Sequence, residues 1–502
     1  MSKIAVPQTE YSPERRTALV FTGTGADGAY HAGALQALNE AGVRVDILAG
    51  RGIGAVGALF GAIDGGSRLW ETTGLWRRPL SAALYPWRRT YRRVAAGTLL
   101  AALLLLIPPA IAGIGLMIYE LAILVEAAYP GSATWITSSW GTFLARVFAS
   151  DALPTRLPQV VTAVLAIVIV AVLAAGLRAR RRLQVRRNQQ GGSWWTLLAT
   201  PFSSDDTARY FITGLWDLLR GGANVRQPRR TDLSRRYAEL LSDNLGQPGF
   251  RELLFVAHDL DARHDIAFAL LRQPWRRGFF AARGPDDAVL RAGETVDLAG
   301  APREVLLDGV AASLSLPGAS DPPFITFAPE SHWRGETHRV TDRPASLLRV
   351  LEEVAHAGVR QVILVTAAEE IGGPHALSTR RATPRGRLGE YFASAEAASV
   401  RDALGAAAGW FDAMFVVRPP HNPVAPLDAG GAFDARSDRW QTVGELVDRG
   451  YEDAYRQFID PVVGASGERL VEVADGPGGG RSRVTDRHES DESRTDTDLT
   501  SH

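Results

Sequence analysis

The chain of 502 residues contains no cysteine and carries no net charge. The absence of cysteine excludes disulfides, thiolate metal ligands and a cysteine nucleophile. Lys+Arg and Asp+Glu both number 55, so there is no overall electrostatic attraction to nucleic acid, and we expect no nucleic-acid partner. Near the N-terminus, Glu10 and Glu14 stand where a secretory signal would have its long apolar core. We therefore expect the N-terminus to stay in the cytoplasm.

Two long runs, 94–119 and 157–177, are apolar and contain no charged residue. Each is long enough to cross an acyl core of about 30 Å, which takes roughly 20 helical residues. Pro108 and Pro109 near the middle of the first run predict a kink there. Arginines crowd the outer ends of both runs, and only two lie between them. This distribution predicts a transmembrane hairpin of two helices with both termini in the cytoplasm, against the alternative of two core helices in a soluble protein.

The rest of the chain alternates strand-like and helix-like segments. The pattern predicts a strand at 17–22, a helix at 29–40, a second strand at 45–49 and a helix of small residues at 53–63. This order is typical of α/β architecture. We divide the chain into a first domain part at 1–66, an insert with the two membrane helices at 70–190, and a connector at 191–235. The remainder of the domain follows at 236–470, and the polar, Gly-rich tail at 471–502 is predicted to be disordered.

The segment 18–63 resembles the opening of bacterial patatin-like phospholipases. In that family a strand, a Gly-rich loop, a helix and a second strand lead to a G-x-S-x-G nucleophile elbow. Here Gly52 stands where the family has its serine, and the flanking elbow residues are Gly50, Arg51, Ile53 and Gly54. The resemblance implies a protein of lipid metabolism with a three-layer α/β/α domain. It further implies a mostly parallel central sheet, interrupted in this chain by the hairpin.

The resemblance continues after the insert, in 251–268 and 308–324. The family then carries an Asp-Gly-Gly motif whose aspartate is the general base of a Ser-Asp dyad. The matching carboxylate in this chain is Asp342, and Arg343 and Pro344 replace the two glycines. The resemblance thus implies that the carboxylate of the dyad is retained while its nucleophile is not.

Three departures from the family pattern bear on chemistry. Gly52 has no side-chain oxygen, and loss of the nucleophile from such a unit costs on the order of 10⁶ in turnover. Asp27 stands where the family has a basic residue, and it would oppose an oxyanion by about 1 to 4 kcal/mol at about 4 Å. Thr24 replaces a glycine and restricts access to positive φ. The loop that would form the oxyanion hole is Gly23, Thr24, Gly25, Asp27 and Gly28.

These departures favour a membrane-bound pseudoenzyme that binds membrane lipid or a protein partner. A second hypothesis is an active phospholipase or esterase that uses water activated by Asp342, or one of the serines Ser313, Ser315 and Ser320. A third is a nucleotide-binding enzyme, because 23–28 also fits G-x-G-x-x-G after a strand. Against the third, Asp46 lies at the start of the next strand, where a ribose-binding acid would lie at its end.

Metal and cofactor are not expected. The histidines His31, His258 and His338 share no metal-ligand spacing, and scattered histidines are usually hydrogen-bonded parts of the structure. The patatin-like family resemblance calls for no cofactor. The sequence leaves the oligomeric state open.

Overall fold

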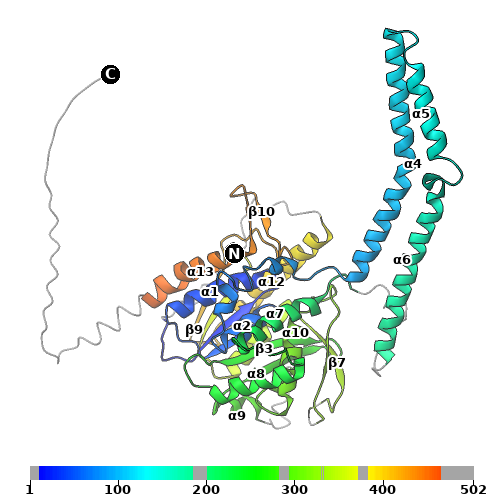
Figure 1. Cartoon of the computed structure of the whole chain (residues 1–502). Coiled ribbons are helices and arrows are strands. Elements are labelled where there is room, and N and C mark those ends of the chain that lie inside the picture. Colours follow the sequence, from blue (N-terminus) through cyan, green and yellow to red (C-terminus); the bar gives the residue numbers. More distant parts are fainter. Residues whose placement is uncertain are drawn as a thin grey trace, which may run out of the picture.

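The computed structural model describes residues 11–184, 200–281, 293–329, 331, 333–370 and 383–464 (Figure 1). They form an α/β domain and a long helical hairpin that projects from it. The predicted disordered tail, 471–502, lies outside the described residues, as does the part 191–199 of the predicted connector.

A nine-stranded, mostly parallel sheet forms the centre of the domain. Its main path runs β5-β4-β3-β2-β1-β8-β9, and β6 and β7 join it through β3. Antiparallel pairs occur only where β3 meets β4 and β7, and between β6 and β7, among the described strands of this sheet. The strands are β1 Thr17–Thr22, β2 Ile47–Arg51, β3 Glu252–Asp259, β4 His264–Leu270, β5 Gly293–Asp297, β6 Phe324–Thr326, β7 Thr337–Thr341, β8 Gln361–Thr366 and β9 Ala413–Val417.

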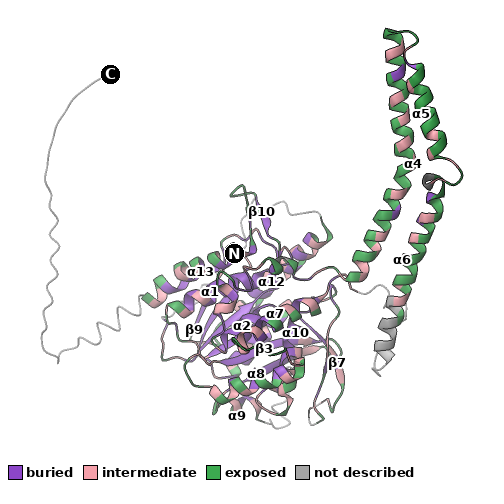
Figure 2. Cartoon of the chain, in the orientation of Figure 1, coloured by how far each residue is buried: buried purple, intermediate pink, exposed green. Residues whose placement is uncertain are grey.

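Helices cover both faces of this sheet (Figure 2). In β1, Leu19 and Phe21 belong to one hydrophobic core, and Ala18 and Val20 belong to the other. This division follows from the alternation of side chains along a strand. The predicted three-layer α/β/α fold with a mostly parallel sheet is therefore confirmed.

The first core is covered mainly by α1 Asp27–Glu40, α2 Gly54–Gly61, α7 Ser204–Leu219, α8 Arg230–Asn244, α10 Leu306–Ser313 and α13 Val443–Ala454. The second is covered by α9 Trp275–Phe280, α11 Leu347–His356 and the C-terminal part of α12 Pro384–Ala406. Shorter elements are α3 Ser67–Trp70, the 3₁₀ turns η1 Pro79–Ala83, η3 Ala301–Val305 and η4 Pro344–Ser346, and the π-helical segment η5 Tyr455–Gly464. A separate two-stranded sheet consists of β10 Ala432–Asp434 and β11 Arg439–Gln441.

β1 has the predicted bounds, whereas β2 lies two residues further along the chain than predicted. The shift is explained by Asp46, the residue just before the observed strand. Its carboxylate accepts a hydrogen bond from the Thr17 N–H at 3.0 Å, and parallel pairing with β1 starts one residue later, at Ile47. The shift carries β2 through Arg51, so the strand reaches the elbow.

The projecting hairpin consists of α4 Arg89–Ala128, α5 Thr134–Val147 and α6 Leu153–Gln184. At 1.5 Å per residue α4 is about 60 Å long, about twice the thickness of an acyl core. The two predicted apolar runs lie within α4 and α6, and α5 is a further helix that the sequence analysis does not predict. α4 is continuous through Pro108 and Pro109, although Figure 1 shows it changing direction about halfway along.

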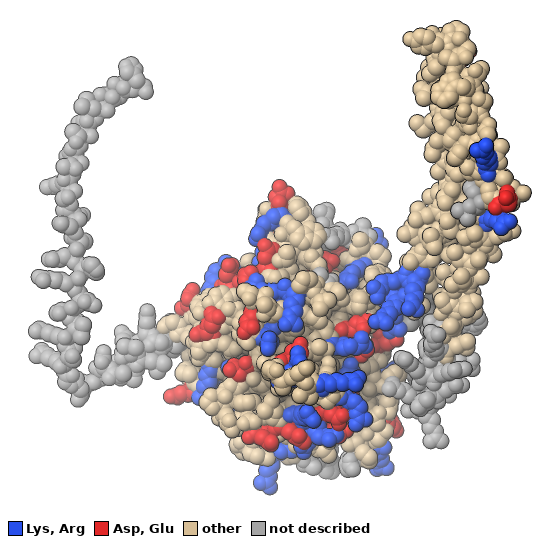
Figure 3. All heavy atoms as spheres, viewed as in Figure 1, with Lys and Arg blue, Asp and Glu red and all other residues tan. Residues whose placement is uncertain are grey.

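Most residues of the helical hairpin are exposed or intermediate, and few are buried (Figure 2). In the most apolar windows of α4 and of the span Thr155–Ala174 in α6, only 6% and 11% of the residues are buried. That share is low for a helix in the core of a soluble protein. Figure 3 shows arginines gathered at the base of the hairpin and few charges beyond it. Both helices are long and apolar enough to cross a membrane.

Candidate functional site

The chain turns sharply from strand to helix after β2. β2 ends at Arg51 and α2 begins at Gly54, so the turn lies at Gly52 and Ile53. Gly52 has φ +57°, a conformation that glycine adopts without steric cost. A Cβ atom on Gly50 would lie 2.6 Å from the carbonyl carbon of Gly54, which explains why the turn needs small residues. This backbone has the form of a nucleophile elbow.

The structure brings Asp342 to this elbow. Asp342 follows β7, and its N–H donates to the Ser315 carbonyl at 3.1 Å. Its Oδ2 atom lies 3.0 Å from the position that a Cβ atom on Gly52 would take. The position without a nucleophile and the carboxylate matched to the family's base are therefore neighbours in one buried site.

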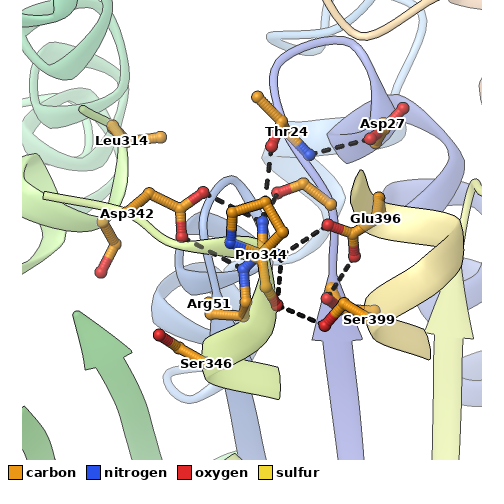
Figure 4. Close-up of polar contacts among 12 residues, drawn as sticks. Thr24, Asp27, Arg51, Leu314, Asp342, Pro344, Ser346, Glu396 and Ser399 are labelled. Atoms are coloured by element: carbon orange, nitrogen blue, oxygen red, sulfur yellow. Dashed lines mark hydrogen bonds and ion pairs between the residues drawn. The ribbon is translucent and has the colours of Figure 1, made fainter. Parts of the chain in front are cut away.

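The side chain of Arg51 occupies the centre of this site (Figure 4). Its Nε donates to Oδ1 of Asp342 at 3.1 Å, and its Nη2 donates to Oδ2 at 2.9 Å. On the other side, Nη1 donates to Oε2 of Glu396 at 2.5 Å and to the Pro344 carbonyl at 3.2 Å. We call Arg51, Asp342 and Glu396 the ion cluster. All three side chains are buried.

Electrostatics keeps Arg51 charged within the ion cluster. Burial by itself would lower the pKa of Arg51, but attraction to Asp342 and Glu396 outweighs it and raises that pKa above its usual value. For Asp342, burial raises the pKa to about 6, against the lowering effect of Arg51. Thr22 donates a further hydrogen bond to Glu396 at 2.5 Å. One guanidinium thus compensates two buried carboxyl groups, each of which would be costly alone.

The carbonyl oxygen of Gly23 closes the space over the elbow. It accepts the Ile53 N–H at 3.0 Å and the Arg51 Nη2 at 3.2 Å. It also lies only 2.2 Å from the position of a Cβ atom on Gly52. In nucleophile elbows, the N–H of the residue after the nucleophile belongs to the oxyanion hole. Here that donor is already bonded, and a side chain at Gly52 has no room.

Asp27 folds back onto the Gly-rich loop. Its Oδ2 atom accepts the Thr24 N–H at 2.8 Å, and the side chain is buried. Burial raises the pKa of Asp27 to about 7, while the hydrogen bond from Thr24 acts in the opposite direction. A backbone donor of the loop is thereby taken by a carboxyl group of the protein itself. The predicted repulsion between Asp27 and a bound oxyanion stays a prediction.

The remaining glycines of the loop are packed against other segments. Gly25 has φ +60°, and a Cβ atom on it would lie 2.0 Å from the Pro426 oxygen, which accepts the Ala26 N–H at 2.8 Å. A Cβ atom on Gly28 would lie 2.4 Å from the ring of Trp76. The loop is therefore filled by protein at the places where the nucleotide hypothesis would put phosphates.

The three serines considered as substitute nucleophiles serve as hydrogen-bonding groups in the packed interior. Ser313 donates to two carbonyl groups at 3.2 and 3.3 Å. Ser320 accepts the Leu316 N–H at 2.7 Å, and its hydroxyl lies 3.2 Å from that of Ser315. All three are buried. Within the described part of the chain, no hydrogen bond joins any of these hydroxyls to the Asp342 carboxylate.

The histidines are also committed to local contacts. The Nε2 atom of His31 lies 3.0 Å from the Thr22 carbonyl, and burial lowers the pKa of His31 to about 3, so the ring is neutral. His258 pairs with Asp265 at 2.7 Å, and His338 pairs with a buried carboxylate at 2.6 Å. Among the described residues, no group of three or more His, Asp or Glu side chains is arranged to hold a metal ion.

The sequence pattern does not predict the ion cluster. It places Arg51 in the elbow without a partner and does not single out Glu396, which comes from α12 in the C-terminal half of the chain. One feature points toward the cluster: an arginine between two glycines at the end of a buried strand has to be buried, and a buried arginine needs a carboxylate. Which carboxylate it meets depends on the tertiary fold.

The fold and the site define a three-layer α/β protein with the backbone of a nucleophile elbow and an ion cluster in place of its nucleophile. No protein-family model matches the chain. A stretch of 70 residues, 14% of this chain, is 41% identical to patatin-like phospholipase domain-containing protein 6 of Homo sapiens, Mus musculus and Pongo abelii. The stretch is 5% of each relative, so the chain spans a small part of the curated relatives it matches.

Among solved structures, the chain matches VipD from Legionella pneumophila at 13% sequence identity, over 90% of this chain and 68% of that one. The TM-score of this match is 0.28. The similarity to patatin-like phospholipase domain proteins therefore depends on the matched stretch. These relatives carry the name of the family that the segment 18–63 resembles.

Proposed function

We propose that this chain is a membrane-held protein whose patatin-like domain does not hydrolyse lipid esters and acts by binding lipid or a protein partner. The observation that carries the proposal is the occupancy of the elbow. Where a hydrolase needs a nucleophile oxygen and an open oxyanion hole, this site contains a glycine, the Gly23 carbonyl and the Arg51 guanidinium.

A covalent mechanism at this elbow is excluded by composition, because Gly52 has no oxygen to form an acyl-enzyme. A mechanism through activated water needs a carboxylate that can reach solvent and accept a proton. Asp342 is 2% exposed, and both of its oxygens accept hydrogen bonds from Arg51. These contacts support absence of turnover by either route.

The membrane part of the proposal is supported by length, composition and exposure. α4 and α6 are both apolar, and most of their residues in the spans face outward. Arginines flank them at the domain side, Arg92 and Arg93 before the first span and Arg178 after the second. Since positive residues next to a span stay in the cytoplasm, we propose that the hairpin crosses the bilayer twice and leaves the α/β domain and both termini on the cytoplasmic side.

The central experiment measures ester turnover and covalent labelling of the full chain in detergent micelles. We expect no turnover of short-chain or phospholipid esters above the buffer rate, and no labelling by a fluorophosphonate probe. An active patatin-like phospholipase in the same micelles is the positive control. Turnover that disappears in Asp342→Ala would overturn the proposal in favour of a water-based hydrolase. Labelling that disappears when Ser313, Ser315 or Ser320 is changed to alanine would favour a substitute serine.

The binding half of the proposal needs its own measurement. Lipid that remains with the protein after purification in mild detergent can be identified by native mass spectrometry of the intact complex. We expect retained phospholipid on the full chain. A chain that is free of lipid and also recovers no specific protein partner by cross-linking in membranes would contradict a binding role.

A further inference from the structure

The small sheet β10–β11 has two different faces. The strands pair antiparallel, with Phe433 opposite Trp440 and Ala432 opposite Gln441. Because side chains alternate along a strand, Phe433 and Trp440 share one face of the hairpin. That face points outward, and the two aromatic side chains are 53% and 47% exposed. Ala432 and Gln441 are buried on the other face.

Hydrogen bonds to Asp434 hold the hairpin in shape. Its Oδ1 atom accepts the Arg436 N–H at 3.0 Å and lies 3.0 Å from Nε2 of His421. Its Oδ2 atom accepts the Ser437 hydroxyl at 2.8 Å and a side-chain N–H of Gln441 at 3.4 Å. The turn between the strands is therefore anchored by one buried carboxylate. The two aromatic rings are presented on a preformed scaffold, so they need little ordering to bind a surface.

The β10–β11 hairpin lies on the side of the domain from which α4 and α6 extend. It follows β9 at the carboxyl-terminal ends of the parallel strands, where the elbow also lies. Arg385 links the two regions, because it donates to the Leu84 carbonyl at 2.8 Å, shortly before α4, and to the Leu427 carbonyl at 2.7 Å, shortly before β10. Figure 1 shows β10 rising from the domain on the side toward which α4 and α6 run.

We propose that Phe433 and Trp440 insert into the headgroup region of the bilayer that α4 and α6 cross, so that the β10–β11 hairpin is a second membrane contact. This inference rests on the proposed membrane crossing. The indole ring of Trp440 has an apolar body and a polar N–H, and such rings favour the membrane–water interface. The phenyl ring of Phe433 beside it adds apolar area on the same face. A contact at this place would hold the elbow edge of the domain toward the lipid.

A lipid surface fits these two residues better than a protein partner does. A stable protein interface takes about 800 Å² from each side, whereas a headgroup layer accepts single aromatic side chains. The turn carries two acidic and two basic residues, Asp434, Arg436, Asp438 and Arg439, so its charges balance and give no net electrostatic preference for an anionic protein. The proposed occupant of this face is therefore a phospholipid bilayer, whether zwitterionic or anionic.

The absence of cysteine allows a clean test, since any introduced cysteine is the single labelling site. Ala435→Cys places an environment-sensitive nitrobenzoxadiazole dye at the hairpin turn and leaves both aromatic rings intact. Ile169→Cys in α6 reports on the membrane span. Trp410→Cys is the matched domain control, because it lies between α12 and β9, at the amino-terminal end of that strand, and is exposed. Each full-length variant is reconstituted in phosphatidylcholine vesicles, with and without lipids that carry a quenching nitroxide near the headgroup.

We expect the nitroxide to quench most of the fluorescence of the dye at 435 and at 169, and little of that at 410. Adding Phe433→Ser and Trp440→Ser to the Ala435→Cys variant should abolish the quenching at 435. The same two serine changes added to the Ile169→Cys variant should leave the quenching at 169 intact. Equal, weak quenching at 435 and 410 with strong quenching at 169 would overturn the inference and leave the membrane crossing intact. Weak quenching at all three sites would overturn both. Quenching at 435 that survives the double serine change would show that the rings do not make the contact.

Discussion

Arg51 and Asp342 form a two-point ion pair in the interior of the domain, with Nε to Oδ1 at 3.1 Å and Nη2 to Oδ2 at 2.9 Å. The pair lies at the elbow, where the resemblance to patatin-like phospholipases implies a serine next to an aspartate. In this chain the aspartate pairs with Arg51, and charge compensation by the guanidinium accounts for a carboxylate buried at this place.

Arg51→Leu should destabilise the protein strongly, because it leaves Asp342 and Glu396 buried without a counterion. Removal of one partner from a buried ion pair costs about 3 to 5 kcal/mol. The triple change Arg51→Leu, Asp342→Leu and Glu396→Leu should cost less than Arg51→Leu alone, since no uncompensated charge is left. Denaturant unfolding of the full chain in detergent, followed by tryptophan fluorescence, measures both. A triple variant that loses as much unfolding free energy as Arg51→Leu alone, or more, would mean that the three side chains do not act as a cluster.

Gly52→Ser should be destabilised and remain without turnover. A side chain at φ +57° costs about 1 to 2 kcal/mol, and its Cβ atom would also meet the Gly23 oxygen at 2.2 Å. Gly42 is a matched control, because it has φ +65° and a Cβ atom there would meet nothing within 4 Å. Gly42→Ala should therefore lower the unfolding temperature less than Gly52→Ala. Esterase activity in Gly52→Ser alone would show that the loop opens readily and that the site is not closed.

Asp27 should make stability depend on pH near neutrality. Its pKa in the folded protein is raised to about 7 from an ordinary value near 4, so the folded state binds the proton more tightly than the unfolded state. The stabilisation is therefore complete below about pH 4 and is lost as the pH rises toward 7. Asp27→Asn keeps an acceptor for the Thr24 N–H and should flatten this part of the profile. A parent and a variant with the same decline in unfolding free energy between pH 4 and 7 would contradict the assignment.

The proposed membrane topology predicts opposite accessibility of two single cysteines. Thr134→Cys at the start of α5 lies at the far end of the hairpin, and Thr72→Cys lies in the α/β domain. A membrane-impermeant maleimide applied to intact cells should label position 134 and reach position 72 only after the cells are opened. Labelling of both positions from outside, or of neither, would rule out a hairpin that crosses the membrane twice with its domain in the cytoplasm.

Much of the fold follows from local pattern. β1 has the predicted bounds because it is a short, apolar run that lies in the middle of the sheet. The runs in α4 and α6 were recognisable because about 20 apolar residues without charge have few other solutions. α5 was missed because its Thr, Ser and Trp residues match neither a core helix nor a span. It forms along α4, where Gly115 allows the ring of Trp140 to approach.

The site divides in the same way. The glycine frame of the elbow and the absence of a nucleophile at Gly52 are properties of the sequence, because a missing oxygen cannot be supplied by folding. The occupancy of the elbow is a property of the tertiary structure. Glu396 lies in a helix far along the chain, and it reaches Arg51 only because α12 packs near the carboxyl end of β2. Burial then decides the chemistry, since a charge removed from water must find its counterion nearby, and only the folded chain determines which one it finds.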